Sequence, residues 1–221
     1  ANLGLRRTKK CGEFLSMASW LAMREPGLTT NVMKSQLNRL YGQLYAAQQN
    51  YDDALQAFAK DVYHCSLEYG TDEPRTSLGY YNLGKVFQAA GRLERALACF
   101  DRVVEIWVIS LRLAVLEESD ERKDLPVNRS QLMEVVDMLQ DIAGLMAASP
   151  SRRLCTADAH AATAMALLHI GEVERAVEAV KEARHRAPRG DAQRMSLLNC
   201  VASAIKKEAA KLGLEANEEE V

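Results

Sequence analysis

Residues 77–110 read SLGYYNLGKVFQAAGRLERALACFDRVVEIWVIS, and this stretch decides the fold. Two sets of apolar and small residues recur in it at helical spacing: Tyr80, Leu83, Gly84 and Phe87, then Ala96 and Phe100. Gly84 and Ala96 keep each helix thin where the other crosses it, and the aromatic side chains fill the gap. Gly91 stands where the first helix must stop, as a glycine just beyond a helix end does. The stretch therefore predicts two antiparallel helices joined by a short turn.

This pattern resembles the tetratricopeptide repeat (TPR), whose first helix carries W-x2-L-G-x2-Y and whose second carries A-x3-F. Tyr80 and Phe87 replace the outer aromatic residues of the first motif, and Ala96-x3-Phe100 matches the second. The resemblance implies an all-α fold in which helical hairpins stack into an α-solenoid.

The same pattern occurs earlier, with Tyr41-Gly42 on a first helix and Ala54-x3-Phe58 on a second. Gly42 and Gly84 are 42 positions apart, against a usual TPR period of about 34. The longer repeat of about 42 residues resembles the long-helix variant of kinesin light chain repeats. Gly70 is expected to end the second helix of this hairpin, and Thr76 or Ser77 to cap the next helix.

Residues 1–24 read as half of a repeat. Cys11-x3-Leu15 occupies the A-x3-F positions, and Phe14, Ala18 and Leu21 extend an apolar stripe at helical spacing. A single helix cannot bury such a face alone, so we expect the chain to be a fragment whose first hairpin is incomplete.

The chain divides into four predicted parts. Residues 1–116 form the first TPR hairpins, with the last helix running to about Glu118, and residues 117–129 form a charged loop. Residues 130–212 contain one amphipathic helix, a further hairpin from Ala157 to about Gly190 and a capping helix from Asp191. Residues 213–221 form an acidic tail.

Composition and motifs exclude several function classes. The net charge of −2 gives no electrostatic case for nucleic acid or an anionic membrane. The five cysteines are scattered, which indicates reduced thiols of an intracellular protein. There is no glycine-rich phosphate loop, nucleophile elbow or H-E-x-x-H, so no enzyme, cofactor or metal site is expected.

The function class that remains is the recognition of other proteins by surface residues. In a TPR superhelix the first helices line the concave face, where polar side chains hold a peptide or a partner helix. The candidate protein-binding residues on that face are Arg39, Gln43, Tyr81, Lys85 and Gln88. Arg75 and Trp107 are added as residues that the repeat pattern does not demand, although Trp107 has a second possible role in the core. Asn82 and Lys85 resemble only part of the carboxylate clamp of chaperone-binding TPR domains, which argues against that use.

The segments GTDEPRTSLGYY (70–81) and VVEIW (103–107) are non-consensus. They resemble the TPR region of the zinc finger MYND domain-containing protein of ciliary axonemes, over about residues 1–110. That family's zinc-binding cysteine cluster has no counterpart here, so the resemblance covers only its C-terminal portion. It implies an axonemal protein in the cytoplasm and cytoskeleton of the cilium or flagellum, associated with single-headed inner-arm dynein and a second TPR protein.

The main hypothesis from the sequence is a non-enzymatic scaffold that helps attach inner-arm dynein to doublet microtubules. Its expected partners are a second axonemal TPR protein, the inner-arm dynein heavy chain and, as a further candidate, doublet microtubule-associated proteins. The alternative hypothesis is a soluble TPR adaptor that binds cargo or chaperone peptides.

Overall fold

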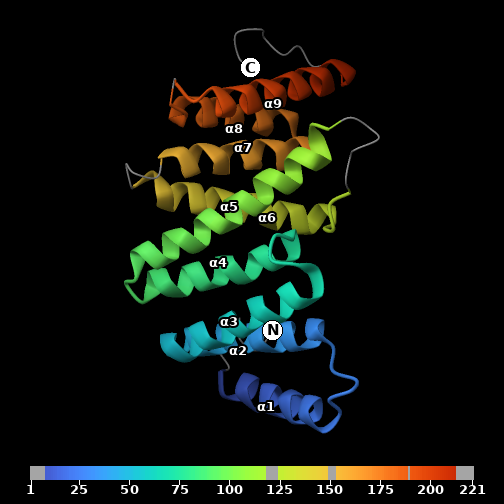
Figure 1. Ribbon diagram of the computed structural model, residues 1–221, viewed down its shortest axis with the longest axis vertical. Helices are drawn as coiled ribbons and strands as arrows, with labels where there is room; N and C mark the ends of the chain where they lie inside the picture. Colours follow the sequence, from blue (N-terminus) through green and yellow to red (C-terminus); the bar gives the residue numbers. More distant parts are fainter. Residues whose placement is uncertain (1–7, 118–123, 149–152, 189, 213–221) are drawn as a thin grey trace. The chain divides into compact units, whose positions relative to one another are not determined.

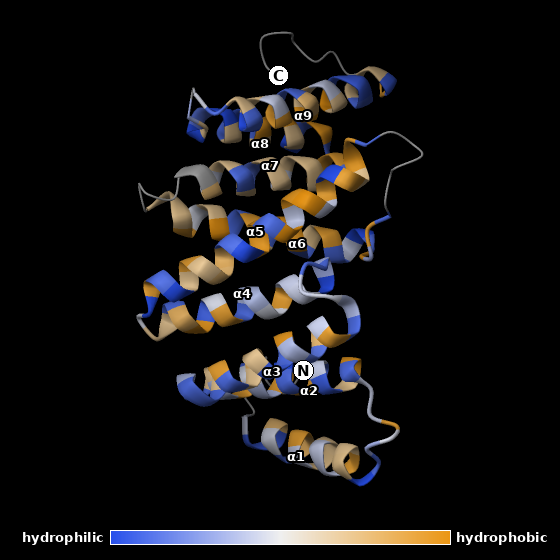
Figure 2. Ribbon diagram, in the orientation of Figure 1, coloured by the Kyte–Doolittle hydropathy of each residue, from blue (hydrophilic) through white to orange (hydrophobic). Residues whose placement is uncertain are grey.

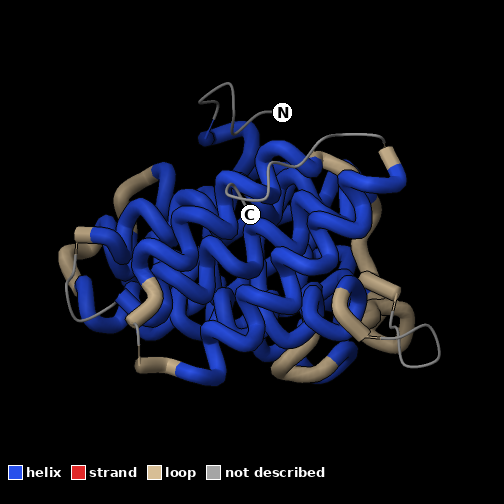
Figure 3. Tube along the Cα trace, turned by 90° about the horizontal axis from the view of Figure 1, so that it is seen from above, coloured by secondary structure: helices blue, strands red, loops and turns tan. Residues whose placement is uncertain are grey.

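The computed structural model describes residues 8–117, 124–148, 153–188 and 190–212, and these ranges contain nine α-helices and no strand (Figures 1 and 3). The chain divides into two compact units, Ala1–Val103 and Val104–Val221. The helices are α1 (Thr8–Arg24), α2 (Asn31–Ala47), α3 (Tyr51–Tyr69), α4 (Pro74–Ala89), α5 (Leu93–Val115), α6 (Arg129–Ala147), α7 (Arg153–Ile170), α8 (Val173–Arg186) and α9 (Ala192–Lys211).

Helices α2 and α3 form the first complete hairpin of the N-terminal unit. Thr30 caps α2 by accepting a hydrogen bond from the Met33 amide at 3.2 Å. A Cβ atom added to Gly42 would lie 2.8 Å from the Phe58 ring, so only glycine permits this approach of the two helices. Ala54 and Phe58 then pack with Val86 of α4 in one apolar cluster.

The same contact recurs in the next hairpin, 42 positions later, where a Cβ atom on Gly84 of α4 would overlap the Phe100 ring of α5. Gly91 follows the end of α4 with φ of +72°, a left-handed conformation that glycine adopts without strain. These two glycine–phenylalanine contacts confirm the TPR hairpins that the sequence predicts. The second helices are long, with 19 residues in α3 and 23 in α5, as the extended repeat spacing requires.

The predicted N-terminal cap of α4, Thr76 or Ser77, is wrong. Helix α4 begins at Pro74, so Thr76 and Ser77 lie inside its first turn, and Glu73 stands at the cap position without a side-chain hydrogen bond. Proline favours the first helical position because its fixed φ suits the helix and its missing amide hydrogen would be unpaired there. The Thr76 hydroxyl instead donates to the Gly70 carbonyl at 2.9 Å and holds the loop closed.

The end of α5 also differs from the expectation. The helix stops at Val115 rather than near Glu118, and Glu118 itself lies outside the described residues, as do residues 119–123 of the predicted charged loop. The next helix, α6, begins at Arg129 with a capping box in which Asn128 and Gln131 exchange hydrogen bonds at 2.9 Å. The predicted acidic tail, 213–221, lies outside the described residues as well.

In the C-terminal unit, α7 packs against α6 and α8, and α9 packs against α8 and α7. Gly171, with φ of +91°, makes the turn between α7 and α8. Helices α7, α8 and α9 meet in one apolar cluster that contains Ala161, Ala183 and Leu198. Arg194 ties α9 to α7 through two 2.8 Å hydrogen bonds to Asp158, which also raise the pKa of its guanidinium. The described helices are all too short or too polar to cross a membrane.

Candidate protein-binding surface

The predicted binding residues of the N-terminal unit lie on α2 and α4, the first helices of the two hairpins. Arg39 and Gln43 are one turn apart on α2, and Tyr81, Lys85 and Gln88 follow one another at helical spacing on α4. Each of the five is half-buried, so each has a side chain that is partly accessible. Both helices pack against α3.

Arg39 is engaged inside the unit. Its guanidinium binds the carboxylate of Asp61 on α3, with Nε 2.9 Å from Oδ2 and Nη2 3.1 Å from Oδ1. The Ser35 hydroxyl donates to the same carboxylate at 2.5 Å. The Asp61 side chain is 0% exposed and the Arg39 side chain 23% exposed. Arg39 therefore serves first as the partner of a buried charge, since an unpaired carboxylate at this position would cost several kcal/mol.

Sequence reasoning did not find the Asp61 pair. The signal that could have found it is the placement of a carboxylate three residues after Phe58, on the helix face that carries Ala54 and Phe58 toward α2. A charge on a core-facing stripe needs a partner on the neighbouring helix, and Arg39 was the nearest candidate by register.

Tyr81 and Lys85 form one continuous patch on α4. The Lys85 ammonium lies 6.0 Å from the centre of the Tyr81 ring, and that ring lies 6.0 Å from the centre of Phe100. Asn82, on the same helix, has a buried amide nitrogen without a hydrogen-bond partner among the described residues. This patch offers a cation and an aromatic face to a bound polypeptide, whereas the Asn82 amide nitrogen is buried beneath it.

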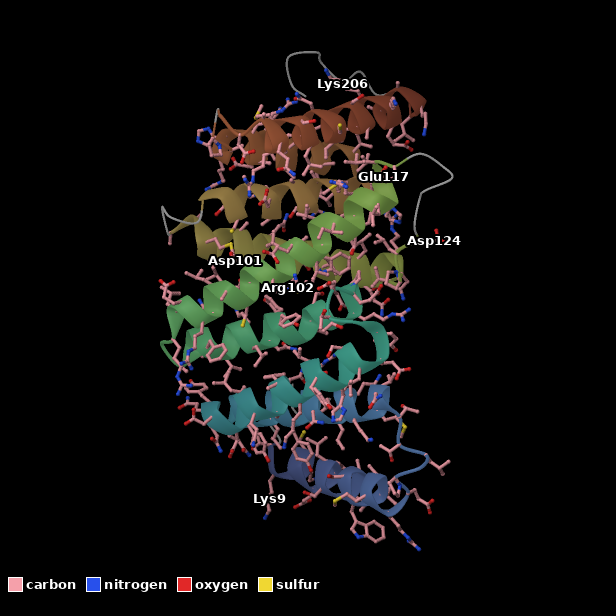
Figure 4. The ribbon with its side chains drawn as sticks, viewed as in Figure 1. Lys9, Asp101, Arg102, Glu117, Asp124 and Lys206 are labelled. Carbon is pink, nitrogen blue, oxygen red and sulfur yellow. The ribbon has the colours of Figure 1, made fainter. Side chains whose placement is uncertain are left out.

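Arg75, the second residue of α4, is exposed. Its guanidinium lies 4.5 Å from the centre of the Tyr69 ring at the end of α3, a cation–π contact that holds the side chain in place. The preceding loop is fixed by an ion pair between Asp72 and Arg102 of α5; Figure 4 labels Arg102. Arg75 therefore stands in the first turn of α4 on an ordered base.

Trp107 is a core residue, not a binding residue; the sequence had left both roles open. Its side chain is 1% exposed and it belongs to the core of the C-terminal unit. A side chain with this burial does not offer its indole to a partner, because the apolar surface is already removed from water.

Residues 34–107 match the family model of the tetratricopeptide repeat. The match begins within α2 and ends within α5, and it includes both glycine–phenylalanine contacts. The fold class is an all-α TPR solenoid. TPR proteins are generally non-catalytic scaffolds, and the repeats at residues 34–107 indicate a role in protein–protein interactions.

Proposed function

We propose that this chain is a non-enzymatic scaffold of the ciliary axoneme. In this role it helps attach single-headed inner-arm dynein to doublet microtubules by binding a second TPR protein and the tail of the dynein heavy chain. The observation that carries the interaction role is the TPR region at residues 34–107, with its polar and aromatic patch on α4.

The axonemal setting is supported by residues that the repeat does not require. The GTDEPRTS loop resembles that of the axonemal family, and its Arg75 is exposed and held over Tyr69. Side chains that are exposed and yet ordered suit recognition, because little conformational entropy is lost when a partner binds them. Localisation to the cytoplasm and cytoskeleton of the cilium or flagellum is part of the same proposal.

Affinity isolation from flagellar axonemes tests the proposal. The tagged wild-type chain should co-purify with an inner-arm dynein heavy chain and a TPR partner, and Arg75→Ala should reduce that recovery without changing the melting temperature. Absence of the chain from every dynein-containing fraction would refute the axonemal role.

The same affinity isolation distinguishes the axonemal scaffold from the alternative, a soluble TPR adaptor that binds peptides. Lys85 lies beside the Tyr81 ring on α4, and its positive charge suits a peptide carboxylate. A cargo or chaperone adaptor would bind short free peptides with an affinity that Lys85→Ala weakens, and it would be missing from dynein fractions.

A further inference from the structure

Two glycines identify the packed side of α4. A Cβ atom on Gly79 would lie 2.7 Å from Val62 of α3, and one on Gly84 would overlap the Phe100 ring of α5. At roughly 3.6 residues per turn, the direction opposite the midpoint between these glycines passes close to Leu78. The Leu78 side chain is 41% exposed. Helix α4 therefore turns one side away from α3 and from the start of α5.

Four side chains follow one another on or beside this outward side of α4, and we call them the α4 row: Arg75, Leu78, Tyr81 and Lys85. Arg75 is exposed, and Tyr81 and Lys85 are half-buried. Figure 2 shows that hydrophilic and hydrophobic residues both occur along α4. Because a helix rises roughly 1.5 Å per residue, the two ends of the row are about 15 Å apart. The row thus has a cation at each end, with an apolar and an aromatic side chain between them.

An aromatic ring supports the cation at each end of the row. The Arg75 guanidinium lies 4.5 Å from the centre of the Tyr69 ring, and the Lys85 ammonium lies 6.0 Å from the centre of the Tyr81 ring. The Tyr81 ring in turn lies 6.0 Å from the centre of Phe100. A cation–π contact orders a long side chain, and the ring brings no opposite charge to it. Both ends of the row therefore keep a positive charge that attracts carboxylates.

The charged side chains of α2 and α4 all have one sign. They are Lys34, Arg39, Arg75 and Lys85. Helix α3, against which both of these helices pack, carries mostly acidic residues: Asp52, Asp53, Asp61 and Glu68, with Lys60 as its one lysine. Charges of one sign gathered on the first helices favour a partner of the opposite sign.

The two acidic residues that precede α4 do not cover the row. Asp72 forms an ion pair with Arg102. The Cγ atom of Glu73 lies 3.8 Å from the position that a Cβ atom on Gly70 would take, so this side chain folds back toward the loop. Among the described residues, Arg75 itself has the Tyr69 ring as its side-chain contact and takes part in no ion pair. The Arg75 end of the row is therefore accessible to a carboxylate from outside.

The spacing of the row indicates the form of its ligand. An extended chain advances roughly 3.3 Å per residue, and its side chains at positions i, i+2 and i+4 point to one side. Carboxylates at i and i+4 are then about 13 Å apart, close to the separation of Arg75 and Lys85, and an apolar side chain at i+2 lies between them. A helical ligand needs about ten residues to span the same distance. An extended segment therefore fits the row with fewer ordered residues.

We propose that the α4 row binds an extended acidic segment of a partner protein, with acidic residues at positions i and i+4 and an apolar residue at i+2. One carboxylate meets Arg75, the apolar side chain packs on Leu78 and Tyr81, and the other carboxylate meets Lys85. The TPR match at residues 34–107 indicates protein–protein interactions, which argues for a partner protein as the occupant. This inference rests on the proposed interaction role and names the chemistry of the partner.

A short peptide provides a defined probe. It contains Glu-Ser-Leu-Ser-Glu between Gly-Ser flanks, and it is acetylated and amidated so that its ends carry no charge. In an NMR titration of the isotope-labelled full chain, the amides of α4 should shift and saturate, and a rise in salt from about 50 mM to about 300 mM should weaken binding. Two control peptides test charge and spacing: Gln-Ser-Leu-Ser-Gln has no carboxylates, and Glu-Glu-Leu-Ser-Ser has the same composition with its carboxylates side by side. Both should bind about fivefold more weakly or less tightly still.

Variants of the row test which side chains bind the peptide. Arg75→Ala and Lys85→Ala should each weaken binding about two- to fivefold, and the double variant about tenfold or more. Leu78→Ser should weaken it as well, because the apolar contact is lost. Lys60→Ala is the matched control, since it removes the same charge from an exposed position on α3 and should leave binding unchanged. Melting temperatures close to the wild-type value show that each variant keeps its fold.

Four outcomes would overturn the proposal. The first is no saturable shift with up to about 1 mM peptide, and the second is equal binding of either control peptide. The third is an equal loss in Lys60→Ala and Arg75→Ala, which would indicate attraction without a site. The fourth is binding that becomes about tenfold tighter when residues 213–221 are removed, which would make the acidic residues of this chain itself the occupant.

Recovery with dynein is a separate measurement. A chain that co-purifies with dynein but does not bind the peptide refutes this inference alone. A chain that binds the peptide but is absent from every dynein-containing fraction refutes the axonemal role alone.

Discussion

The buried carboxylate of Asp61 allows one quantitative prediction. Arg39→Ala removes the two donors, at 2.9 and 3.1 Å, and leaves the 0% exposed carboxylate with the Ser35 hydroxyl as its remaining hydrogen-bond donor among the described residues. Removal of one member of a buried ion pair costs about 3–5 kcal/mol. Because Arg39 is itself 23% exposed, water can enter the vacated space, and we expect a loss of about 3 kcal/mol.

The assay is urea and thermal unfolding followed by circular dichroism. For a chain of this length, a loss of that size lowers the melting temperature by roughly 6–12 °C. Asp61→Ala should cost about 2 kcal/mol, because the partly exposed guanidinium can be hydrated, and the double variant should show a coupling of about 2 kcal/mol. Arg92→Ala is the matched control, since Arg92 forms a 3.0 Å pair with Asp52 that is exposed on both sides and contributes about 0–1 kcal/mol.

The refuting result is an Arg39→Ala protein within about 0.5 kcal/mol of the wild type. This result would mean that Asp61 finds other partners, and that Arg39 is available for recognition. The outcome matters for function, because loss of partner binding in Arg39→Ala identifies a contact only if the fold survives. Lys85→Ala does not disturb Asp61 and is the better test of the α4 patch.

Three further predictions follow from the helix contacts and caps. Gly84→Leu places side-chain atoms in the volume of the Phe100 ring and should destabilise the N-terminal unit by about 3 kcal/mol or more, whereas Gly144→Ala, with no atom within 4 Å of the new Cβ, should not destabilise the protein in the same thermal unfolding assay. Burial, together with the nearby Arg186 charge, lowers the pKa of His160. As pH drops below about 6.5, the histidine is therefore protonated in the unfolded chain before the folded one, and the free energy of unfolding falls. In urea unfolding, His160→Gln should lose less stability than the wild type between about pH 7.5 and about pH 5.5, and equal losses would contradict the role of His160. Asn128→Ala removes the cap of α6 and should cost about 1 kcal/mol, while Asn128→Ser should retain most of it; melting temperatures would decide.

The hairpins were predictable because their determinants are local. Gly42 contacts Phe58 and Gly84 contacts Phe100, and in each pair the two residues are 16 positions apart. Because this spacing recurs, both contacts can be predicted from the sequence. Gly91 was placed correctly for the same reason, since a left-handed residue after a helix end favours glycine whatever surrounds it. The wrong cap at Thr76 or Ser77 came from ranking hydroxyl residues above Pro74, which prefers the first helical position.

The candidate site was predicted less well than the fold. The sequence placed Arg39, Gln43, Tyr81, Lys85 and Gln88 on the first helices, and they do lie there. It did not show that Arg39 is the partner of a buried carboxylate, because that depends on which α2 residue stands opposite Asp61 across the hairpin. Partner identity and cellular location stay proposals.

Residue spacing alone was sufficient for the helical hairpins, the long second helices and the apolar stripe of α1. Tertiary packing decided that Trp107 is core, that Arg39 is engaged and that the stripe at Phe14 and Leu21 is exposed. The physical reason is that helix periodicity specifies which residues share a face, whereas burial depends on whether another helix covers that face. On α3 the face is covered by α2, whereas on α1 the corresponding face is open among the described helices.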